Sequence, residues 1–272
     1  MKNILKNKTA VLGLIIILLL IIIAIFGKYI TPYNPSIGEL SDSFKPPSLT
    51  HFFGTDDQGR DIFSRIIDGS RISLKIAIIS VSIALTIGTF LGSIAGYYEG
   101  ILDTIIMRFM DIMLAFPSIL LAIALMSALG KGINSAIIAI SVVSIPQYAR
   151  IVKGSVLSTK QNEYVEAAKM VGNSNAAIIL KYIIPNTFSP IVVRATIGIS
   201  EAILDTAALG FLGLGVQPPQ AEWGSMLGAG RGYIYNAPHI LLFPGIFITI
   251  TVLAFNLFGD GLRDALDPKF RK

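Results

Sequence analysis

Six strongly apolar stretches alternate with polar segments along this chain. A helix that crosses a bilayer needs roughly 20 mostly apolar residues, and each stretch is close to that length. Inside lipid every main-chain polar group has to be bonded within the protein, which a helix achieves by itself. The sequence therefore predicts an all-α polytopic membrane protein with six transmembrane helices, at 11–26, 72–97, 104–129, 135–150, 189–214 and 239–258.

The composition supports a membrane protein and narrows the possible chemistry. Of the 272 residues, 53% are hydrophobic and 14% are charged, whereas soluble domains carry about 25% charged residues. The absence of cysteine excludes a disulfide, a thiolate nucleophile and a cysteine metal site. Because His51 and His239 are the only histidines, we expect no metal site, and we interpret His51 as a surface residue. The net charge of +5 fits basic cytoplasmic edges rather than nucleic-acid binding.

The basic residues predict the orientation of the chain. Lys2, Lys6 and Lys8 precede the first apolar run, which is too long for a signal peptide and lacks a cleavage site of small residues. We therefore expect residues 1–30 to form a cytoplasmic start and an uncleaved first span. The short segments on that side, within 150–181 and 263–272, carry nine further basic residues, whereas the short outer turns carry only Lys131 and Arg231. Both termini, including the tail 263–272, should therefore be cytoplasmic.

The segment 31–71 is polar, broken by prolines and expected outside the membrane. Its end, 61–68, alternates charged and apolar residues at helical spacing. Arg65 lies four residues after Asp61 and three before Asp68, so it is spaced to pair with either one. This pattern predicts an amphipathic helix that lies on the membrane surface.

The transmembrane core is expected to cover 72–262. Gly88, Gly92 and Gly96 recur every four residues on one helix face, which favours close packing against another helix. Pro117 interrupts the third span because proline has no N–H to continue the helix. We therefore expect a break within that span.

Charged residues inside spans are candidates for function, because lipid does not tolerate them. Arg108 and Asp111 lie near the cytoplasmic end of the third span, and their spacing suits simple pairing or snorkelling. In the fifth span, one helix face carries three charged residues and a glycine: Arg194, Gly198, Glu201 and Asp205. Two roles remain open for this face, namely lining the translocation path or structural pairing at a subunit contact.

The cytoplasmic segment 151–188 contains the longest charged, helix-favouring stretch between apolar ones. The polar face of this stretch is formed by Glu163, Glu166 and Lys169. Its apolar face is formed by Tyr164, Val165, Ala168 and Val171. Gly172 followed by 173–175 predicts a helix stop and a new N-cap. A second short helix over 176–184 should then be limited by Pro185. By itself this pattern also fits an ordinary amphipathic loop helix.

Part of this segment resembles a known signature. Glu166, Ala167 and Ala168, followed by Gly172 six residues after the glutamate and then by Pro185, resemble the EAA motif of ABC importer permeases. Three further stretches resemble the dipeptide/oligopeptide/nickel branch of that family: 54–74, 107–117 and 211–227. The resemblance thus covers nearly the whole chain, with its motifs in the same order as in the family.

The resemblance implies a type I ABC importer permease-like bundle and the role of the second membrane subunit. In this family the motif forms a coupling helix that docks into the ATP-hydrolysing subunit. It therefore implies ATPase coupling at Glu163, Glu166, Ala167, Ala168, Gly172 and Pro185. The implied partners are a second homologous permease, two ATP-binding subunits, an extracytoplasmic substrate-binding protein and membrane lipid, in the cell membrane of a prokaryote. ATP and Mg would belong to the ATPase subunits, because this chain has no phosphate-binding loop. We expect no cofactor and no enzymatic activity of its own.

The leading functional hypothesis is therefore ATP-driven import of peptides by alternating access. A nickel or metal-chelate importer is the alternative, although the scarcity of histidine and cysteine favours peptides. A secondary transporter would show internal repeats and its own ion-coupling site, and neither is clear in this sequence. A membrane enzyme would need a catalytic constellation, which the sequence does not offer.

Overall fold

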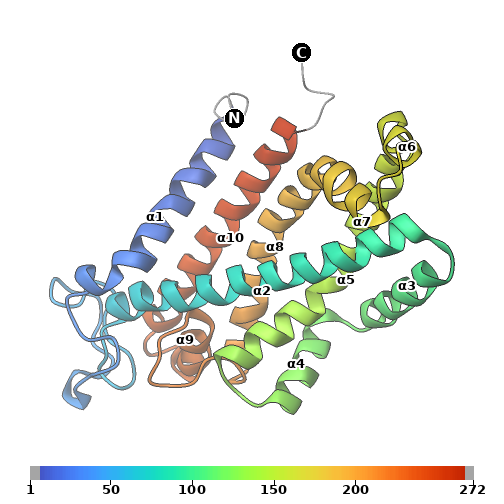
Figure 1. Cartoon of the computed structure of the whole chain (residues 1–272). Helices are drawn as coiled ribbons and strands as arrows, with labels where there is room; N and C mark the ends of the chain where they lie inside the picture. Colours follow the sequence, from blue (N-terminus) through green and yellow to red (C-terminus); the bar gives the residue numbers. More distant parts are fainter. Residues whose placement is uncertain (1–6, 267–272) are drawn as a thin grey trace.

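The computed structural model describes residues 7–266, and within that range the helices form a bundle without β-strands. The beginning of α1 and the end of α10 lie at the same end of the bundle (Figure 1). The helices are α1 (Lys8–Ile30), α2 (Ile62–Tyr98), α3 (Gly100–Ala115), α4 (Ser118–Leu129), α5 (Ile133–Lys160), α6 (Glu163–Met170), α7 (Asn175–Ile178), α8 (Phe188–Phe211), α9 (Trp223–Gly230) and α10 (His239–Leu266). The predicted all-α bundle is confirmed.

The six predicted spans are found when one broken pair of helices is counted as a single span. Five helical stretches are each long and apolar enough to cross a membrane, and α3 and α4 pass that test only together. These two helices meet at a bend of 94°. Phe116 is extended at the bend, and Pro117 is the N-cap of α4. Because proline has no N–H, it cannot continue the hydrogen bonds of α3. The predicted interruption at Pro117 is confirmed.

The predicted glycine strip of α2 packs against α5. A methyl group on Gly88 would lie 2.5 Å from Cβ of Tyr148, and one on Gly96 would lie 2.9 Å from a carbonyl oxygen of α5. At Gly92 the methyl group would overlap the carbonyl oxygen of Ala149. Because these separations are shorter than van der Waals contact, no larger side chain fits at these three positions without a shift. The close-packing interpretation is confirmed.

The surface helix expected at 61–68 is not a separate element, because residue 61 is the N-cap of α2 and residues 62–68 form its first turns. Asp61 caps α2, and its side chain accepts a hydrogen bond from a main-chain N–H of the first turn. Ile62 and Ile66 are buried in an apolar cluster with residues of the α9 region and α10. The prediction failed because this apolar stripe meets protein instead of the membrane surface.

Charged residues of the segment between α1 and α2 pair across the loop. The Nε atom of Arg65 lies 3.5 Å from Oδ2 of Asp56, so Arg65 does not form the pairs with Asp61 and Asp68 that its spacing suggested. His51 is buried instead of lying on the surface, and its Nδ1 atom lies 2.9 Å from Oδ1 of Asp61. Sequence spacing did not reveal these partners because the loop folds back on itself.

The short helix α9 fastens the connection between α8 and α10 to α2. Glu222 caps α9, and its carboxylate accepts hydrogen bonds from the N–H groups of Gly224 and Ser225, both at 2.8 Å, and from the Ser73 hydroxyl at 3.1 Å. Burial raises the pKa of the Glu222 carboxyl, and these three donors oppose the shift by stabilising the carboxylate. The neighbouring Trp223 is buried and donates to a main-chain carbonyl of α2 at 3.0 Å.

Replacing Gly92 by alanine should destabilise the folded protein by about 1–3 kcal/mol, because the added methyl group overpacks the contact between α2 and α5. Thermal unfolding of the detergent-solubilised protein measures this effect. Gly154→Ala on α5 is the matched control, since nothing lies within 4 Å of the position of its new methyl group. A Gly92→Ala variant as stable as the control would contradict close packing.

Candidate functional site

The turn after α6 has the local structure that the sequence predicts. Gly172 has a φ of 84°, a left-handed conformation that favours glycine after a helix. The Asn173 side chain donates to the carbonyl oxygen of Ala168 at 2.9 Å, and the Ser174 hydroxyl caps α7 by accepting from the N–H of Ala177 at 3.3 Å. The predicted helix stop and new N-cap are confirmed.

A narrow apolar stripe attaches α6 to the rest of the bundle. Val165 and Ala168, three residues apart, are buried. Val165 belongs to a cluster contributed by α2, α5, α7, the following turn and α8: Tyr97, Val152, Val156, Ile178, Ile183 and Ile191. The Tyr97 hydroxyl also donates to Oδ1 of Asn175 at 2.8 Å. The base of α6 is therefore held by apolar contacts, and the hydrogen bond from Tyr97 fixes the beginning of the neighbouring α7.

The other sides of α6 are open. The exposed residues of α6 and the turn after it are Glu163, Tyr164, Glu166, Ala167, Lys169, Met170, Val171 and Gly172. Tyr164 and Val171 belong to the predicted apolar face but are exposed, because a helix of two turns buries only one stripe of residues three apart. In Figure 1, α6 lies at the edge of the bundle, at the end where α1 begins and α10 ends.

Pro185 does not end the second helix as predicted. The chain passes from α7 through a π-helical turn, Ile179–Ile183, and a 3-10 turn, Ile184–Thr187, into α8. Proline has no N–H to donate, but it is tolerated at the first positions of a helical turn, where that N–H is not needed. The proline therefore accompanies a change of helical type, and the path from α7 to α8 remains helical.

Basic residues of α5 pair with acidic residues at α3. Three ion pairs, each with a nitrogen–oxygen distance of 2.7 Å, join Arg150 to Asp111, Lys153 to Asp103 and Lys160 to Glu99. Asp111 thus pairs across helices instead of with Arg108, its neighbour on α3. These pairs hold α3 against the half of α5 that lies beside the attachment of α6.

Arg194 and Glu201 form a two-pronged ion pair on α8. The Nη1–Oε1 distance is 2.8 Å and the Nη2–Oε2 distance is 2.6 Å. Arg194 also donates to the side chain of Gln147, and its guanidinium carbon lies 5.6 Å from the ring centroid of Tyr148, both on α5. The Tyr148 hydroxyl reaches the backbone of Gly198, where any side chain would collide with it.

Three of the four residues on the predicted polar face of α8 therefore form a compact cluster, and Asp205 lies outside it. Arg194 holds Glu201, which relieves the repulsion expected between Glu201 and Asp205. Asp205 is partly buried one turn away. The side chain of Glu201 is 47% exposed, so the cluster opens to the surface of the chain. Gln147 and Tyr148 were missed by sequence reasoning because they are uncharged and lie on another helix.

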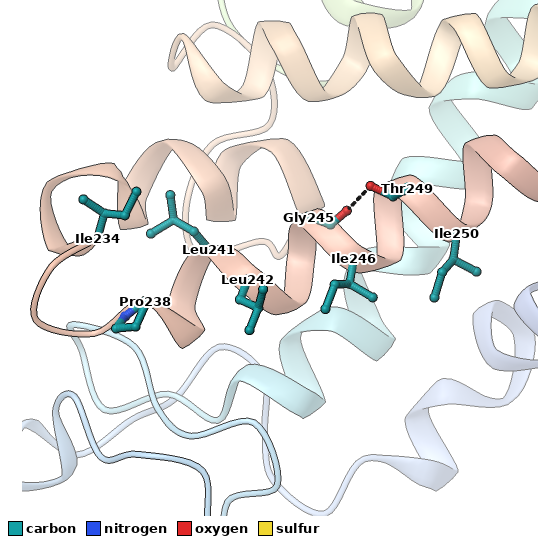
Figure 2. A pocket seen from close by; sticks show the side chains of 8 residues that line it. All are labelled: Ile234, Pro238, Leu241, Leu242, Gly245, Ile246, Thr249 and Ile250. Carbon is teal, nitrogen blue, oxygen red and sulfur yellow. Dashed lines mark hydrogen bonds between the residues drawn. The ribbon is translucent and has the colours of Figure 1, made fainter.

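A second kind of surface is the apolar hollow on α10 shown in Figure 2, with a volume of about 550 Å³. Its lining is formed by Ile234, Pro238, Leu241, Leu242, Gly245, Ile246, Thr249 and Ile250. The Thr249 hydroxyl donates to the Gly245 carbonyl at 2.8 Å (Figure 2), so its hydrogen atom is already used within the helix. This hollow suits apolar contact and offers no charged group for binding or chemistry.

Known sequences match this chain along nearly its whole length. Residues 88–272 match the family described as the binding-protein-dependent transport system inner membrane component, and residues 1–47 match the N-terminal TM domain of oligopeptide transport permease C. The dipeptide transport system permease protein DppC of Alkalihalophilus pseudofirmus is 51% identical over 270 residues, covering 99% of this chain and 89% of that protein. The glutathione transport system permease protein GsiD of Escherichia coli is 49% identical over 267 residues, covering 98% and 88%.

Solved structures of ABC importers share the fold. An inward-facing structure of the MetNI methionine ABC transporter has a TM-score of 0.64 at 19% identity and covers 76% of this chain and 98% of that one. A second crystal form of that transporter gives a TM-score of 0.62 at 22% identity, with 75% and 96% covered. Permeases of this kind are transporter subunits and not enzymes, as the sequence predicted. The chain belongs to the binding-protein-dependent transport system inner membrane component family, the membrane-embedded permeases of ABC importers.

Proposed function

We propose that this chain is the second permease subunit of an ATP-driven importer of peptides. Its relatives DppC and GsiD are named for dipeptides and for glutathione. Glutathione is itself a small peptide, so both names favour peptides over nickel. The observation that carries the coupling role is the geometry of α6, which is fixed at its base and open on its outer sides.

We assign ATPase coupling to the exposed face of α6. Ala167 and Gly172 are small, so a partner surface can approach closely beside Glu163 and Glu166. Ala168 anchors the base of the helix, and Pro185 lies in the turn that leads to α8. Movement is transmitted only if the contact with the ATPase differs in free energy between the ATPase states.

The proposed assembly contains a second permease, two ATP-binding subunits and an extracytoplasmic binding protein. The second permease would complete the pathway, the ATPases would supply ATP and Mg, and the binding protein would deliver the peptide. We place α6 and both termini in the cytoplasm. The basic residues Lys8, Lys153, Lys160 and Arg263 at that end of the bundle support this orientation, because cytoplasmic edges carry excess lysine and arginine.

We assign Arg194, Glu201 and Asp205 to the translocation path. Lipid does not tolerate such charges, and the partial exposure of Glu201 requires water or polar protein beside it. A zwitterionic peptide carries an ammonium group and a carboxylate, so both signs of charge on this face have a counterpart on the substrate. The alternative of pairing at a contact with the second permease would need the same residues to be covered by protein.

The coupling role predicts that Ala167→Leu lowers ATP-dependent uptake by about fivefold or more. Overpacking a contact costs about 1–3 kcal/mol, which weakens binding by about fivefold or more. Ala167 is exposed, so the fold should tolerate the larger side chain. The measurement is uptake of radiolabelled Ala-Ala by proteoliposomes that contain the assembled importer, its binding protein and enclosed ATP.

Ser158→Leu on α5 is the matched control for this prediction, because Ser158 is exposed at the same end of the bundle but lies outside α6. Its uptake should equal that of the wild-type importer. Equal losses in both variants would show that any bulky residue at this end disturbs the protein. If the wild-type importer took up no Ala-Ala in the presence of ATP, peptide import itself would be wrong.

The ion pair on α8 predicts a measurable coupling between its two members. Replacing Arg194 and Glu201 by glutamine, singly and together, should give a coupling energy of about 1 kcal/mol in thermal unfolding, because Arg194 is mostly buried and cannot be fully solvated when it loses its partner. Additive effects of the two substitutions would mean that the pair contributes nothing to stability.

A further inference from the structure

A small hollow lined by three arginines lies at the end of α8 that is remote from α6. We name it the arginine pocket, after Arg60, Arg65 and Arg231. Its other walls come from the end of α8, the loop that follows and α9, and none of the lining residues is acidic. Its volume of about 200 Å³ is roughly the share of six or seven water molecules. The arginine pocket can therefore admit one end of a peptide.

The two buried guanidinium groups of the pocket share one close carboxylate. Oδ2 of Asp56 lies 2.7 Å from Nε of Arg60 and 3.5 Å from Nε of Arg65. Oδ1 of Asp56 accepts from the main-chain N–H groups of Gln58 and Arg60, both at 2.9 Å. Two further acids lie nearby: Oδ1 of Asp57 is 3.9 Å from Nη2 of Arg60, and Oε2 of Glu222 accepts from the N–H of Ser225, a wall of the pocket, at 2.8 Å. Both oxygens of Asp56 are thus fully used.

The arginines retain N–H groups for a ligand. Nη1 of Arg65 donates to the carbonyl oxygen of Pro35 at 2.7 Å, and the hydrogen bond of the Arg60 side chain uses Nε. Arg231 is exposed, and its side chain forms no ion pair within residues 7–266. Each arginine carries five N–H donors, so most of the donors around the arginine pocket are not used by the contacts described.

The side chains that line the arginine pocket carry only positive charge, from Arg60, Arg65 and Arg231. The acids Asp56, Asp57 and Glu222 lie beside the pocket and are not part of its lining, and Asp56 and Glu222 are bonded to main-chain N–H groups. Guanidinium groups bind carboxylates through paired, charge-assisted hydrogen bonds.

We propose that the arginine pocket binds the C-terminal carboxylate of a peptide at the outer mouth of the permease. This inference rests on the proposed function and adds a recognition site to it. The face of α8 that carries Asp205 continues to Leu212, a wall of the pocket, and seven helical residues span about 10 Å. An extended dipeptide spans about 7 Å, so a peptide that is held by its carboxylate and lies along this face of α8 brings its ammonium group close to Asp205.

Protection from an arginine reagent tests this site without requiring transport. The whole importer in nanodiscs of uncharged lipid is treated with phenylglyoxal, and mass spectrometry follows the modification of Arg231, which is exposed. Ala-Ala should slow the modification by about fourfold when it is present at about three times its dissociation constant. Ala-Ala-amide, which lacks the carboxylate, should give no protection. Arg71, an exposed arginine on α2 outside the pocket, is the internal control and should react equally in all samples.

Three results would overturn the proposal. Equal protection by Ala-Ala and its amide would mean that the carboxylate is not recognised. Protection that appears only in nanodiscs of anionic lipid, with or without peptide, would assign the arginine pocket to a lipid phosphate. No protection in any sample, together with a lower unfolding temperature of Arg231→Gln, would assign the arginines to neutralising the end of α8.

Uptake of Ala-Ala gives an independent test of the same site. In proteoliposomes supplied with loaded binding protein, Arg231→Gln should lower the initial rate by about fivefold, as expected for loss of one charge-assisted hydrogen bond at a partly solvated site, and Arg71→Gln should leave it unchanged. Equal rates for wild type and Arg231→Gln would contradict a role in transport. If wild type itself takes up no Ala-Ala, the proposed function fails, whereas the protection experiment still reports on the arginine pocket.

Discussion

The close contact between the backbones of α2 and α5 supports both the charged cluster on α8 and the attachment of α6. Apolar side chains gain little by leaving lipid for a protein interior, so helices in a membrane depend on close packing of small residues. Gly88 and Gly92 allow that approach, and Tyr148 lies in the space beside Gly88. Because the Tyr148 hydroxyl also touches Gly198, the helices α2, α5 and α8 meet at one side chain.

One helix, α5, contacts both the charged cluster on α8 and the attachment of α6. Gln147 and Tyr148 of α5 hold Arg194, and Val156 of the same helix packs in the cluster that fixes Val165 of α6. Eight helical residues separate Tyr148 from Val156, or about 12 Å. The helix α6 is thus linked to α8 both through α5 and through the helical path that contains Pro185, as the proposed coupling role requires.

The opposite end of the bundle is held by a different interaction. There the segment before α2 and the connection through α9 are fastened by buried hydrogen-bonded charges, with Glu222 bonded to Ser73 and Asp56 bonded to Arg60. A buried charge is tolerated only when donors or opposite charges satisfy it. The position of the arginine pocket follows from these constraints, because the same network that orders the loop brings Arg65 beside the end of α8.

The sequence by itself determined the features that depend on neighbouring residues. Hydropathy gave the spans, glycine spacing gave the packing strip, and the break at Pro117 and the turn at Gly172 followed from local backbone chemistry. Only the tertiary structure decided which side chains meet across long separations, including Arg150 with Asp111, Arg65 with Asp56, Arg194 with Gln147 and Tyr148, and the burial of His51 and Trp223. Helical periodicity places a residue on a face, but the partner of that face depends on how distant helices and loops pack.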